Sequence, residues 1–346
     1  MRFAPLILTL IGAVCAAQQP VPARGIAADP WFGTFSIIAL DPATSELGVG
    51  VQARAFGAGA AVPYAKPGVG AVATQASANR QYGPKAIALL EQGLPVEDVV
   101  KRITDEDAGR ATRQVAVIDA KGRSAVYTGR RVIERNSDRN DPVHYGGYAG
   151  HVSGPNYSVQ GNTLASVEVV KAMAAAFEQS QGRLAERLMN ALDAGQAKGG
   201  DTRGMQSAGI LVVRPLDPKS PNTVERIVDI RVDDHENPFK ELRRLLNMTL
   251  GVQRTLTDNA AKLAEQGKLT EAIADLHKAL EINPRSEEIQ YALAQRYAQS
   301  GDTKNAIKWL TTAINRQPHI WKSRAAEDPL FAKLRTTADF KKLLSN

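Results

Sequence analysis

The stretch Gly33-Thr34-Phe35-Ser36-Ile37-Ile38-Ala39 begins the larger part of the chain and predicts how that part folds. A β-branched and aromatic run begins directly after Gly33 and ends at the turn dipeptide Asp41-Pro42, a pattern that predicts a short strand. Two more strands are expected over residues 47–53 and 69–75. The first domain therefore opens as a β layer whose first strand begins at a Gly-Thr junction.

The rest of this domain alternates between strands and pairs of helices. We expect helices over 83–92, 95–104, 163–179, 184–195 and 237–250, and strands over 113–119, 123–128, 207–213 and 224–232. Residues 130–162 are rich in Gly, Asn and Asp and are expected to form a loop. Antiparallel hairpins fed by helix pairs predict two sheets packed face to face with helices outside them. The expected fold class is α+β, with a four-layer αββα sandwich over residues 34–252.

An internal repeat fills the C-terminal part of the chain. Four pairs of residues are spaced by 34 positions: Gly267 and Gly301, Ala272 and Ala306, Ala279 and Ala313, and Pro284 and Pro318. A period of 34 with small residues at fixed helical positions is typical of tetratricopeptide repeats. We expect an all-α repeat domain over residues 253–346, with copies at 255–288 and 289–322 and a capping helix within 323–346. Such arrays bind proteins or peptides; the alternative is a packing appendage.

The first 33 residues are expected to precede the folded domains. Arg2, an apolar run over 4–14 and the small residues after Cys15 predict a secretory signal over residues 1–17. Cys15 also suits a lipoprotein, although Val14 stands where that site takes a small residue. Residues 18–33 contain three prolines and are expected to be a linker or a pro-segment. The chain is therefore expected to be exported, to a periplasm or the exterior.

The composition excludes several classes of function. The chain has 346 residues, 43% of them hydrophobic and 23% charged, with a net charge of +7. Its basic residues are scattered and not interleaved with aromatic residues, so no nucleic-acid partner is expected. Beyond the signal no apolar run approaches the length of a transmembrane anchor. Cys15 is the single cysteine, so neither a disulfide framework nor a Cys-based metal site is expected, and no cofactor is predicted.

Thr34 is the candidate nucleophile. A threonine that heads the first strand of a β layer is where N-terminal nucleophile (Ntn) hydrolases carry their reactive group. The hydroxyl attacks, and the freed α-amine of the same residue acts as the base, since its unperturbed pKa lies near ~8. Because Thr34 is internal even after signal removal, this chemistry requires a second cut between Gly33 and Thr34. The alternative is a β-branched residue that merely starts a strand.

Residues 34–250 resemble the family known as domain of unknown function 1028, whose members belong to the Ntn-hydrolase-like superfamily. The resemblance rests on blocks at 34–37 (TFSI), 47–51 (LGVGV), 68–75 (GVGAVATQ), 82–84 (YGP), 149–151 (AGH), 157–162 (YSVQGN) and 233–235 (DDH). Family members typically begin Met-Thr-Phe-Ser, so that loss of Met exposes the threonine. This chain departs by placing a signal and a linker first. Its Gly-Thr junction is similar to the self-cleavage junction of proteasome β-subunits, and its loop over 134–147 is longer and more polar than the family's.

Polar residues at strand ends supply the other candidates. Gln75, Ser77 and Asn79 lie between a strand end and a helix start, where backbone amides and side-chain amides converge as oxyanion donors. Turn and cap chemistry explains the same Ser and Asn equally well. Arg54 follows the second strand and is a candidate for holding a substrate carboxylate or for lowering the pKa of the Thr34 amine; the alternative is a solvated strand end.

A second group of candidates lies in the Gly-rich segment. His151, Gln160 and Asn162 are predicted to bind substrate, with loop pinning as the alternative role of the histidine. The Asp and His residues near His235 lack regular ligand spacing, so no metal site is expected. Residues 199–204 form a turn-rich loop in which Asp201 and Arg203 either line the pocket or pair with each other on the surface.

Two functions from different classes follow from this sequence. The first is an exported Ntn-type amide hydrolase that uses Thr34 on a small-molecule or peptide substrate. The second is a non-catalytic Ntn-like binding module that recruits protein or peptide partners through its helical repeats. A structural scaffold of the cell envelope is a third possibility. The mass of the mature protein separates the first two, because only the hydrolase requires a new N-terminus at Thr34.

Overall fold

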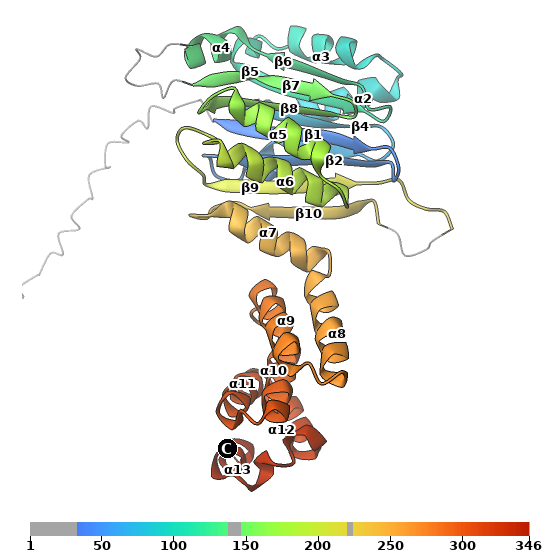
Figure 1. The fold of residues 1–346 in the computed structure, drawn as a ribbon. Helices are drawn as coiled ribbons and strands as arrows, with labels where there is room; N and C mark the ends of the chain where they lie inside the picture. The colour runs from blue at the N-terminus through green and yellow to red at the C-terminus, as the bar shows by residue number, and fades with distance from the viewer. Residues whose placement is uncertain (1–32, 138–146, 220–223, 346) are drawn as a thin grey trace, which may run out of the picture.

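The computed structural model describes residues 33–137, 147–219 and 224–345. The expected signal peptide and all of the expected linker except Gly33 lie outside these residues. The first domain contains two antiparallel sheets, one of six strands in the order β10-β9-β2-β1-β8-β7 and one of four strands in the order β3-β4-β5-β6 (Figure 1).

The strand bounds place the segment after Gly33 in the middle of the larger sheet. That sheet contains β1 (Thr34–Asp41), β2 (Glu46–Ala53), β7 (Tyr148–Gly154), β8 (Tyr157–Leu164), β9 (Ser207–Val213) and β10 (Arg226–Val232). The smaller sheet contains β3 (Pro63–Lys66), β4 (Gly70–Ala76), β5 (Arg113–Asp119) and β6 (Ser124–Thr128).

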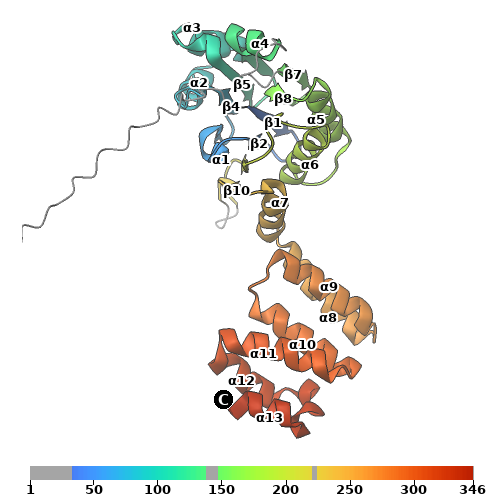
Figure 2. The same cartoon turned by 90° about the vertical axis from the view of Figure 1, so that its left-hand side faces the viewer.

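Helices cover the outer face of each sheet. The larger sheet is covered by α5 (Glu168–Gln179) and α6 (Leu184–Ala197), and the smaller by α2 (Tyr82–Glu91) and α3 (Val96–Asp105). Figure 2 shows these two helix pairs on opposite sides of the strands. Shorter or peripheral helices are α1 (Ala58–Ala61), α4 (Arg130–Ser137) and α7 (Pro238–Thr249). The predicted four-layer αββα sandwich is confirmed.

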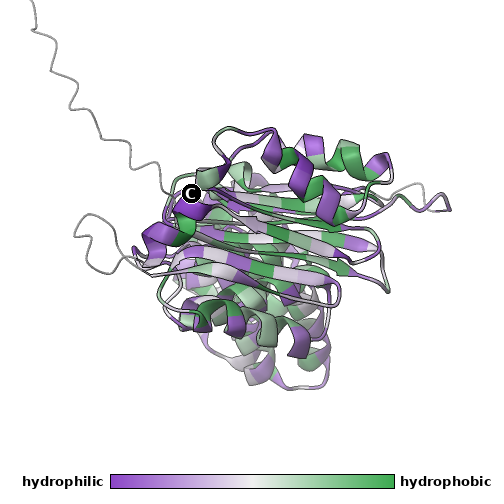
Figure 3. Ribbon diagram, turned by 90° about the horizontal axis from the view of Figure 1, so that it is seen from above, coloured by the Kyte–Doolittle hydropathy of each residue, from purple (hydrophilic) through white to green (hydrophobic). Residues whose placement is uncertain are grey.

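Strict alternation along β1 builds both hydrophobic layers. Phe35, Ile37 and Ala39 pack against the helices, whereas Ile38 and Leu40 pack between the two sheets. In Figure 3 the strands carry much of the apolar colour, and the helices alternate between apolar and polar segments, as amphipathic helices do. Gly48 in β2 lets α6 approach the sheet, since a Cβ there would lie 2.6 Å from Leu188 Cδ1. The LGVGV block thus serves helix-on-sheet packing.

The expected loop over residues 130–162 is wrong for its described part. Residues 130–137 form α4, and β7 and β8 follow, with β8 paired to β1 along residues 34–39. The segment looked like a loop because β8 carries polar side chains on one face, and those side chains are buried between the sheets. The helix expected from Thr163 begins later, at Glu168, since β8 extends to Leu164. Two short elements, α1 and β3, were not predicted.

The C-terminal unit is a stack of antiparallel helices, as predicted. Its helices are α8 (Val252–Glu265), α9 (Leu269–Ile282), α10 (Glu287–Ser300), α11 (Thr303–Arg316), α12 (Pro318–Glu327) and α13 (Ala338–Ser345). Four repeat-related alanines are completely buried where the helices cross: Ala272, Ala279, Ala306 and Ala313. Gly267 and Gly301 both take a positive φ, of 77° and 85°, in the turns between paired helices. The 34-residue spacing therefore encodes equivalent turns and equivalent crossings.

The repeats extend away from the sandwich beyond α7 (Figure 1). Gly251, at a φ of 72°, separates α7 from α8. Arg244 on α7 links the two units, because its Nη1 donates to the Ile282 carbonyl at 2.8 Å while Glu241 holds the same guanidinium. Within the described residues, no helix is long and apolar enough to cross a membrane.

Candidate functional site

Thr34 lies where several strands of both sheets end. It is the first residue of β1 and pairs with Ala53, the last residue of β2, on one side and with Asn162 of β8 on the other. Because strand neighbours alternate faces, its side chain lies on the inter-sheet face with those of Ser36 and Ile38. The residue is only 2% exposed, yet it lines a cavity. Among the described residues, no group is hydrogen-bonded to the Thr34 hydroxyl.

This cavity has a volume of about 210 Å³ and is mostly apolar. Gln75 forms part of its wall, as expected for the segment after β4. The facing wall comes from the end of β2 and from α1, and the residues predicted to bind substrate, His151, Gln160 and Asn162, do not line the cavity. Phe56, which is 73% exposed, and Arg80 lie at the open side. Six alanines supply most of the remaining lining: Ala53, Ala55, Ala58, Ala61, Ala76 and Ala78.

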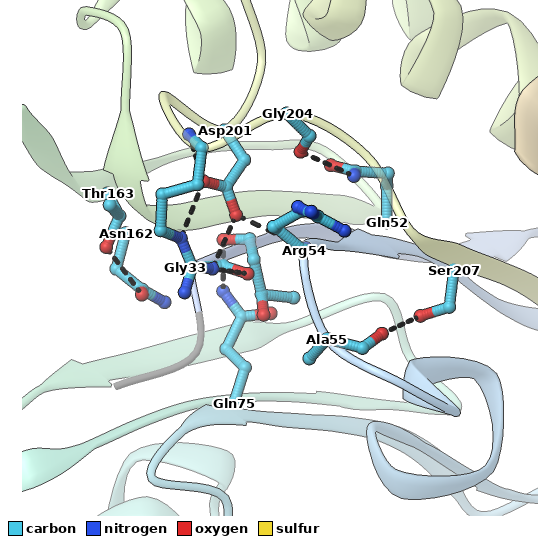
Figure 4. A network of polar contacts seen from close by, with 12 residues as sticks. Gly33, Gln52, Arg54, Ala55, Gln75, Asn162, Thr163, Asp201, Gly204 and Ser207 are labelled. Carbon is cyan, nitrogen blue, oxygen red and sulfur yellow. Dashed lines mark hydrogen bonds and ion pairs between the residues drawn. The ribbon is translucent and has the colours of Figure 1, made fainter. Parts of the chain in front are cut away.

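The Gly33–Thr34 junction is held by a buried ion pair. Arg203 Nη2 donates a hydrogen bond to the Gly33 carbonyl oxygen at 3.0 Å. Asp201 accepts two hydrogen bonds from the same guanidinium: Arg203 Nε donates to Oδ1 at 3.0 Å, and Nη2 donates to Oδ2 at 2.8 Å. Figure 4 shows Asp201 directly beside Gly33. A Cβ at position 33 would lie 2.4 Å from Asp201 Oδ2, so only glycine seats the junction here without displacing this pair.

The Asp201 carboxylate is itself fixed by the backbone around it. Its side chain is fully buried, and it accepts the Arg203 amide at 2.9 Å and the Arg54 amide at 3.4 Å. An isolated bridge also joins Asp201 to Leu164 at the end of β8. Asp201 and Arg203 pair with each other, but the pair is buried at the candidate cleavage site, so the predicted surface position is wrong.

Two strand ends at this site adopt a left-handed backbone. Ala76, which lines the cavity, has a φ of 61°, and Thr163, directly after Asn162, has a φ of 57°. Such a conformation is strained for a β-branched residue. It is retained here because the Thr163 amide donates to Asn136 Oδ1 at 2.6 Å and its carbonyl accepts from Thr202 at 2.9 Å. Strain of this kind often marks functional sites.

Behind Thr34, a buried polar network connects the two sheets. Gln75 Nε2 donates to Gln114 Oε1 at 2.7 Å, and its Oε1 accepts from Ser36 at 2.6 Å. Gln160 Nε2 donates to the Ser36 hydroxyl at 2.6 Å, and Asn162 Nδ2 donates to Gln114 Oε1 at 3.0 Å. All five residues are at most 3% exposed. Gln75, Gln160 and Asn162, which were predicted to act on substrate or oxyanion, thus lie beside Thr34 as a support linking β1, β4, β5 and β8.

Gln114 was not predicted from the sequence. It lies in β5 between the network and the strand end, and its Nε2 donates to the Gly161 carbonyl at 3.0 Å. The signal in the sequence is a glutamine within an otherwise apolar strand, QVAVI. In the structure Gln114 pairs with Gln75 across β4 and β5, and both side chains lie between the two sheets. A lone polar residue in a buried strand requires partners, and here they come from the opposite sheet.

Ser77 and Asn79 stabilise the loop beside the cavity without lining it. The Ser77 amide donates to the Thr112 carbonyl, and the Asn79 amide donates to Thr74 Oγ1. Asn79 Nδ2 also donates to Asp107 at 3.0 Å. Because both amides are engaged, the geometry gives these residues a turn-fixing role, which is the alternative that the sequence left open.

Asp107 anchors this loop from the neighbouring helix end. Burial alone would raise the pKa of its carboxyl group, but hydrogen bonds from Asn79, Tyr82, the Gly109 amide and Arg113 outweigh burial and lower that pKa strongly. Arg113 also donates to the Ser77 carbonyl. The cavity wall that contains Ala76 and Ala78 is therefore held by a charged, multiply bonded group.

The remaining candidates, Arg54, His151 and His235, do not line the cavity. Arg54 has an exposed side chain, and only its amide contacts the junction pair. His151 lies on β7 opposite Gln160 and is exposed; partial desolvation lowers its pKa. His235 Nδ1 accepts the Asn237 amide, and the Asn237 side chain caps α7, as expected of a helix entry. In the parts of the chain that the structure covers, no three His, Cys, Asp or Glu residues are placed to hold a metal ion.

Comparisons with known proteins place this geometry in a family. The model of the family of unknown function DUF1028 matches residues 34–242, which is more than half of the chain. The chain belongs to this family. A tetratricopeptide-repeat model matches residues 263–327, in line with the predicted repeats. Among curated proteins, the comparison finds no match.

One solved structure agrees with this assignment. The crystal structure of a DUF1028 protein from Silicibacter pomeroyi is 31% identical, covers 62% of this chain and 88% of its own, and superposes with a TM-score of 0.52. Anbu (ancestral beta-subunit) from Yersinia bercovieri also matches, at 12% identity, over 63% of this chain and 94% of its own, with a TM-score of 0.28. The similarity to the Silicibacter pomeroyi protein covers a share of this chain close to that of the sandwich domain.

Proposed function

We propose that the sandwich domain is an exported amide hydrolase of the Ntn type, with Thr34 as its nucleophile after a cut between Gly33 and Thr34. One observation carries the proposal. A guanidinium donates to the carbonyl of the bond that must be cut, while the threonine that follows this bond lines a cavity. A residue that merely started a strand would require neither feature.

Arg203 also explains how the peptide bond between Gly33 and Thr34 would be cleaved. Attack by Thr34 Oγ1 on the Gly33 carbonyl carbon places negative charge on the carbonyl oxygen, and Arg203 already donates to that oxygen. When the carbon–nitrogen bond breaks, the nitrogen of Thr34 takes up the hydroxyl proton and an ester remains. Water then hydrolyses the ester. The products are a carboxylate at Gly33, a free hydroxyl and a free α-amine on Thr34.

In turnover, the substrate carbonyl replaces the Gly33 carbonyl. The free amine of Thr34 accepts the hydroxyl proton as the oxygen attacks, and Arg203 stabilises the oxyanion. The amine of the substrate leaves with a proton, and water releases the acyl group from Thr34 as a carboxylic acid. Asp201 keeps the guanidinium in place through both steps, because two-point contact fixes its plane. The oxyanion donor is thus assigned to Arg203 and not to Ser77 or Asn79.

An acyl-transfer probe tests the nucleophile. We expect purified protein incubated with 4-nitrophenyl acetate to retain one acetyl group on Thr34, located by peptide mass spectrometry. Thr34→Ala should remain unlabelled, and Thr44→Ala, in an exposed turn after β1, should label like the natural chain. Labelling that is unchanged in Thr34→Ala, or no labelling in the natural chain, would contradict the proposal.

A second candidate function, partner recruitment, is supported by a hollow on the repeats. This hollow, of about 470 Å³, is lined by Tyr291, Trp321 and Gln295, by the carboxylates of Glu288, Glu327 and Asp328, and by Arg324. The three carboxylates outnumber the one cation, Arg324, whose guanidinium lies 5.2 Å from the centroid of the Trp321 ring, so the hollow suits a cationic segment of a protein partner. We expect a lysine-rich peptide to change the tryptophan fluorescence, to which Trp321 contributes, and a glutamate-rich peptide of equal length to leave it unchanged. Equal responses would contradict a cationic partner.

A further inference from the structure

We propose that the cavity beside Thr34 takes a short apolar acyl chain, and that Arg80 binds a carboxylate on the other side of the amide bond. The substrate class is then a short-chain N-acyl amino acid. This inference rests on the proposed function, because it assumes that the amide carbonyl meets Thr34. It adds the chemistry of the groups on either side of that carbonyl.

The floor of the cavity indicates that the acyl group of the substrate is apolar. Ala53, Ala58, Val62 and Ala76 are each at most 4% exposed, so the depth of the cavity presents methyl groups. An apolar space of ~150 Å³ holds benzene, with six carbon atoms. By the same ratio, the 210 Å³ measured here holds about eight carbon atoms. A chain of that size removes its own surface from water and covers that of the alanines.

The open side of the cavity indicates that the other end of the substrate carries a carboxylate. Arg80 is exposed, and it is the one charged residue among the described residues that line the cavity. A guanidinium at this position matches a carboxylate by charge and by its paired donors. Phe56 lies at the same opening with 73% of its surface exposed, so it can cover the linking atoms of a bound ligand.

The direction of binding follows from depth. Thr34 is 2% exposed and lies toward the floor, whereas Arg80 and Phe56 lie at the opening. The acyl group must remain on Thr34 after the first step, and the amine must leave. The floor therefore suits the acyl chain, and the opening suits the amino acid that departs.

N-Acylglycines of increasing chain length test this assignment on the full-length protein. Binding is measured by ligand-observed NMR, and hydrolysis by release of glycine. We expect butyryl- to octanoylglycine to bind at least about tenfold better than acetylglycine, because each added methylene gains apolar contact. Dodecanoylglycine should bind less well than octanoylglycine because it exceeds the cavity. Butyrylglycinamide, which lacks the carboxylate, should bind about tenfold less well than butyrylglycine.

Variants with matched controls test which residues bind the acyl chain and which bind the carboxylate. Ala61→Leu fills the cavity and should shift the preference to acetylglycine, while Ala60→Leu, exposed on the same helix and outside the lining, should not. Arg80→Gln should abolish the advantage of butyrylglycine over butyrylglycinamide, while the remote Arg285→Gln should not. Selective binding without any hydrolysis would overturn the proposed catalysis but keep this ligand class. Binding or hydrolysis that ignores chain length and carboxylate would overturn the ligand class.

Discussion

At the scale of single residues, the proposed function depends on Arg203 and Gly33. The guanidinium lies against a carbonyl in the buried interior, where an electrostatic contact is stronger than in water. Asp201 neutralises the buried charge of Arg203 and fixes its direction, so the pair is satisfied without any substrate. The absence of a side chain at Gly33 lets the junction approach this pair.

Arg203→Lys should slow self-cleavage by about 100- to 1000-fold, the usual effect of losing one oxyanion donor. Lysine keeps the charge but cannot match the two-point contact with Asp201. The measurement is the fraction of uncut chain over time by intact mass spectrometry. Arg285→Lys, in an exposed turn of the repeats, is the control and should cleave at the natural rate. Equal rates for both variants would remove Arg203 from the mechanism.

Asp107→Asn should reduce the free energy of unfolding by about 1.5–3 kcal/mol at neutral pH, as expected when hydrogen bonds to a charged group are lost. The folded-state pKa of Asp107 is lowered, so its contribution is present above the unfolded pKa of ~3.9 and is lost as the pH falls below that value. Urea unfolding at several pH values should therefore show a gap between variant and natural chain that narrows below about pH 4. A constant gap would show that the charge does not stabilise the loop.

At the scale of elements, β8 shows both the reach and the limit of sequence-based prediction. Strands with apolar alternation, such as β1, β2 and β9, were predicted to within a residue or so. Residues 157–164 were not, because Ser158, Gln160 and Asn162 make one face polar. Their partners, Ser36 and Gln114, lie far away in sequence and come from both sheets. No local pattern reveals that a polar strand face will be satisfied in the interior.

The candidate site also contains residues that the sequence located and residues that it did not. Thr34 and Gln75 could be located from the sequence, since each lies at the end of a recognisable strand. The pairing of Asp201 with Arg203 was one of two alternatives, and its position at Gly33 depends on a contact across 170 residues. The cavity wall from α1 was missed because a four-residue helix of Ala and Gly gives no periodic signal.

Ala306→Leu in α11 should destabilise the repeats by about 1–3 kcal/mol, because the added atoms overpack a helix crossing where Ala306 has no exposed surface. Urea unfolding followed by tryptophan fluorescence measures this, since Trp309 and Trp321 lie in α11 and α12. Asn315→Leu, exposed on the same helix, is the matched control and should change the stability by less than about 0.5 kcal/mol. Equal effects would contradict a tight crossing.

At the scale of the whole molecule, two units with different tasks share one chain. The sandwich contains the junction, the cavity and the network that supports them, whereas the repeats contain an aromatic and acidic hollow. Arg244 on α7 contacts both units by holding the end of α9. A hydrolase tethered in this way to a peptide-binding array would act near the partner that the array binds.

The N-terminus of the mature protein shows whether the bond between Gly33 and Thr34 is cut. Full-length chain is expressed with its own leader, purified, and its intact mass and first residue are determined, with Thr34→Ala prepared in parallel. We expect the natural chain to begin at Thr34 and the Thr34→Ala chain to keep Gly33 and residues before it. A natural chain that still carries Gly33, or a Thr34→Ala chain cut at the same bond, would contradict it.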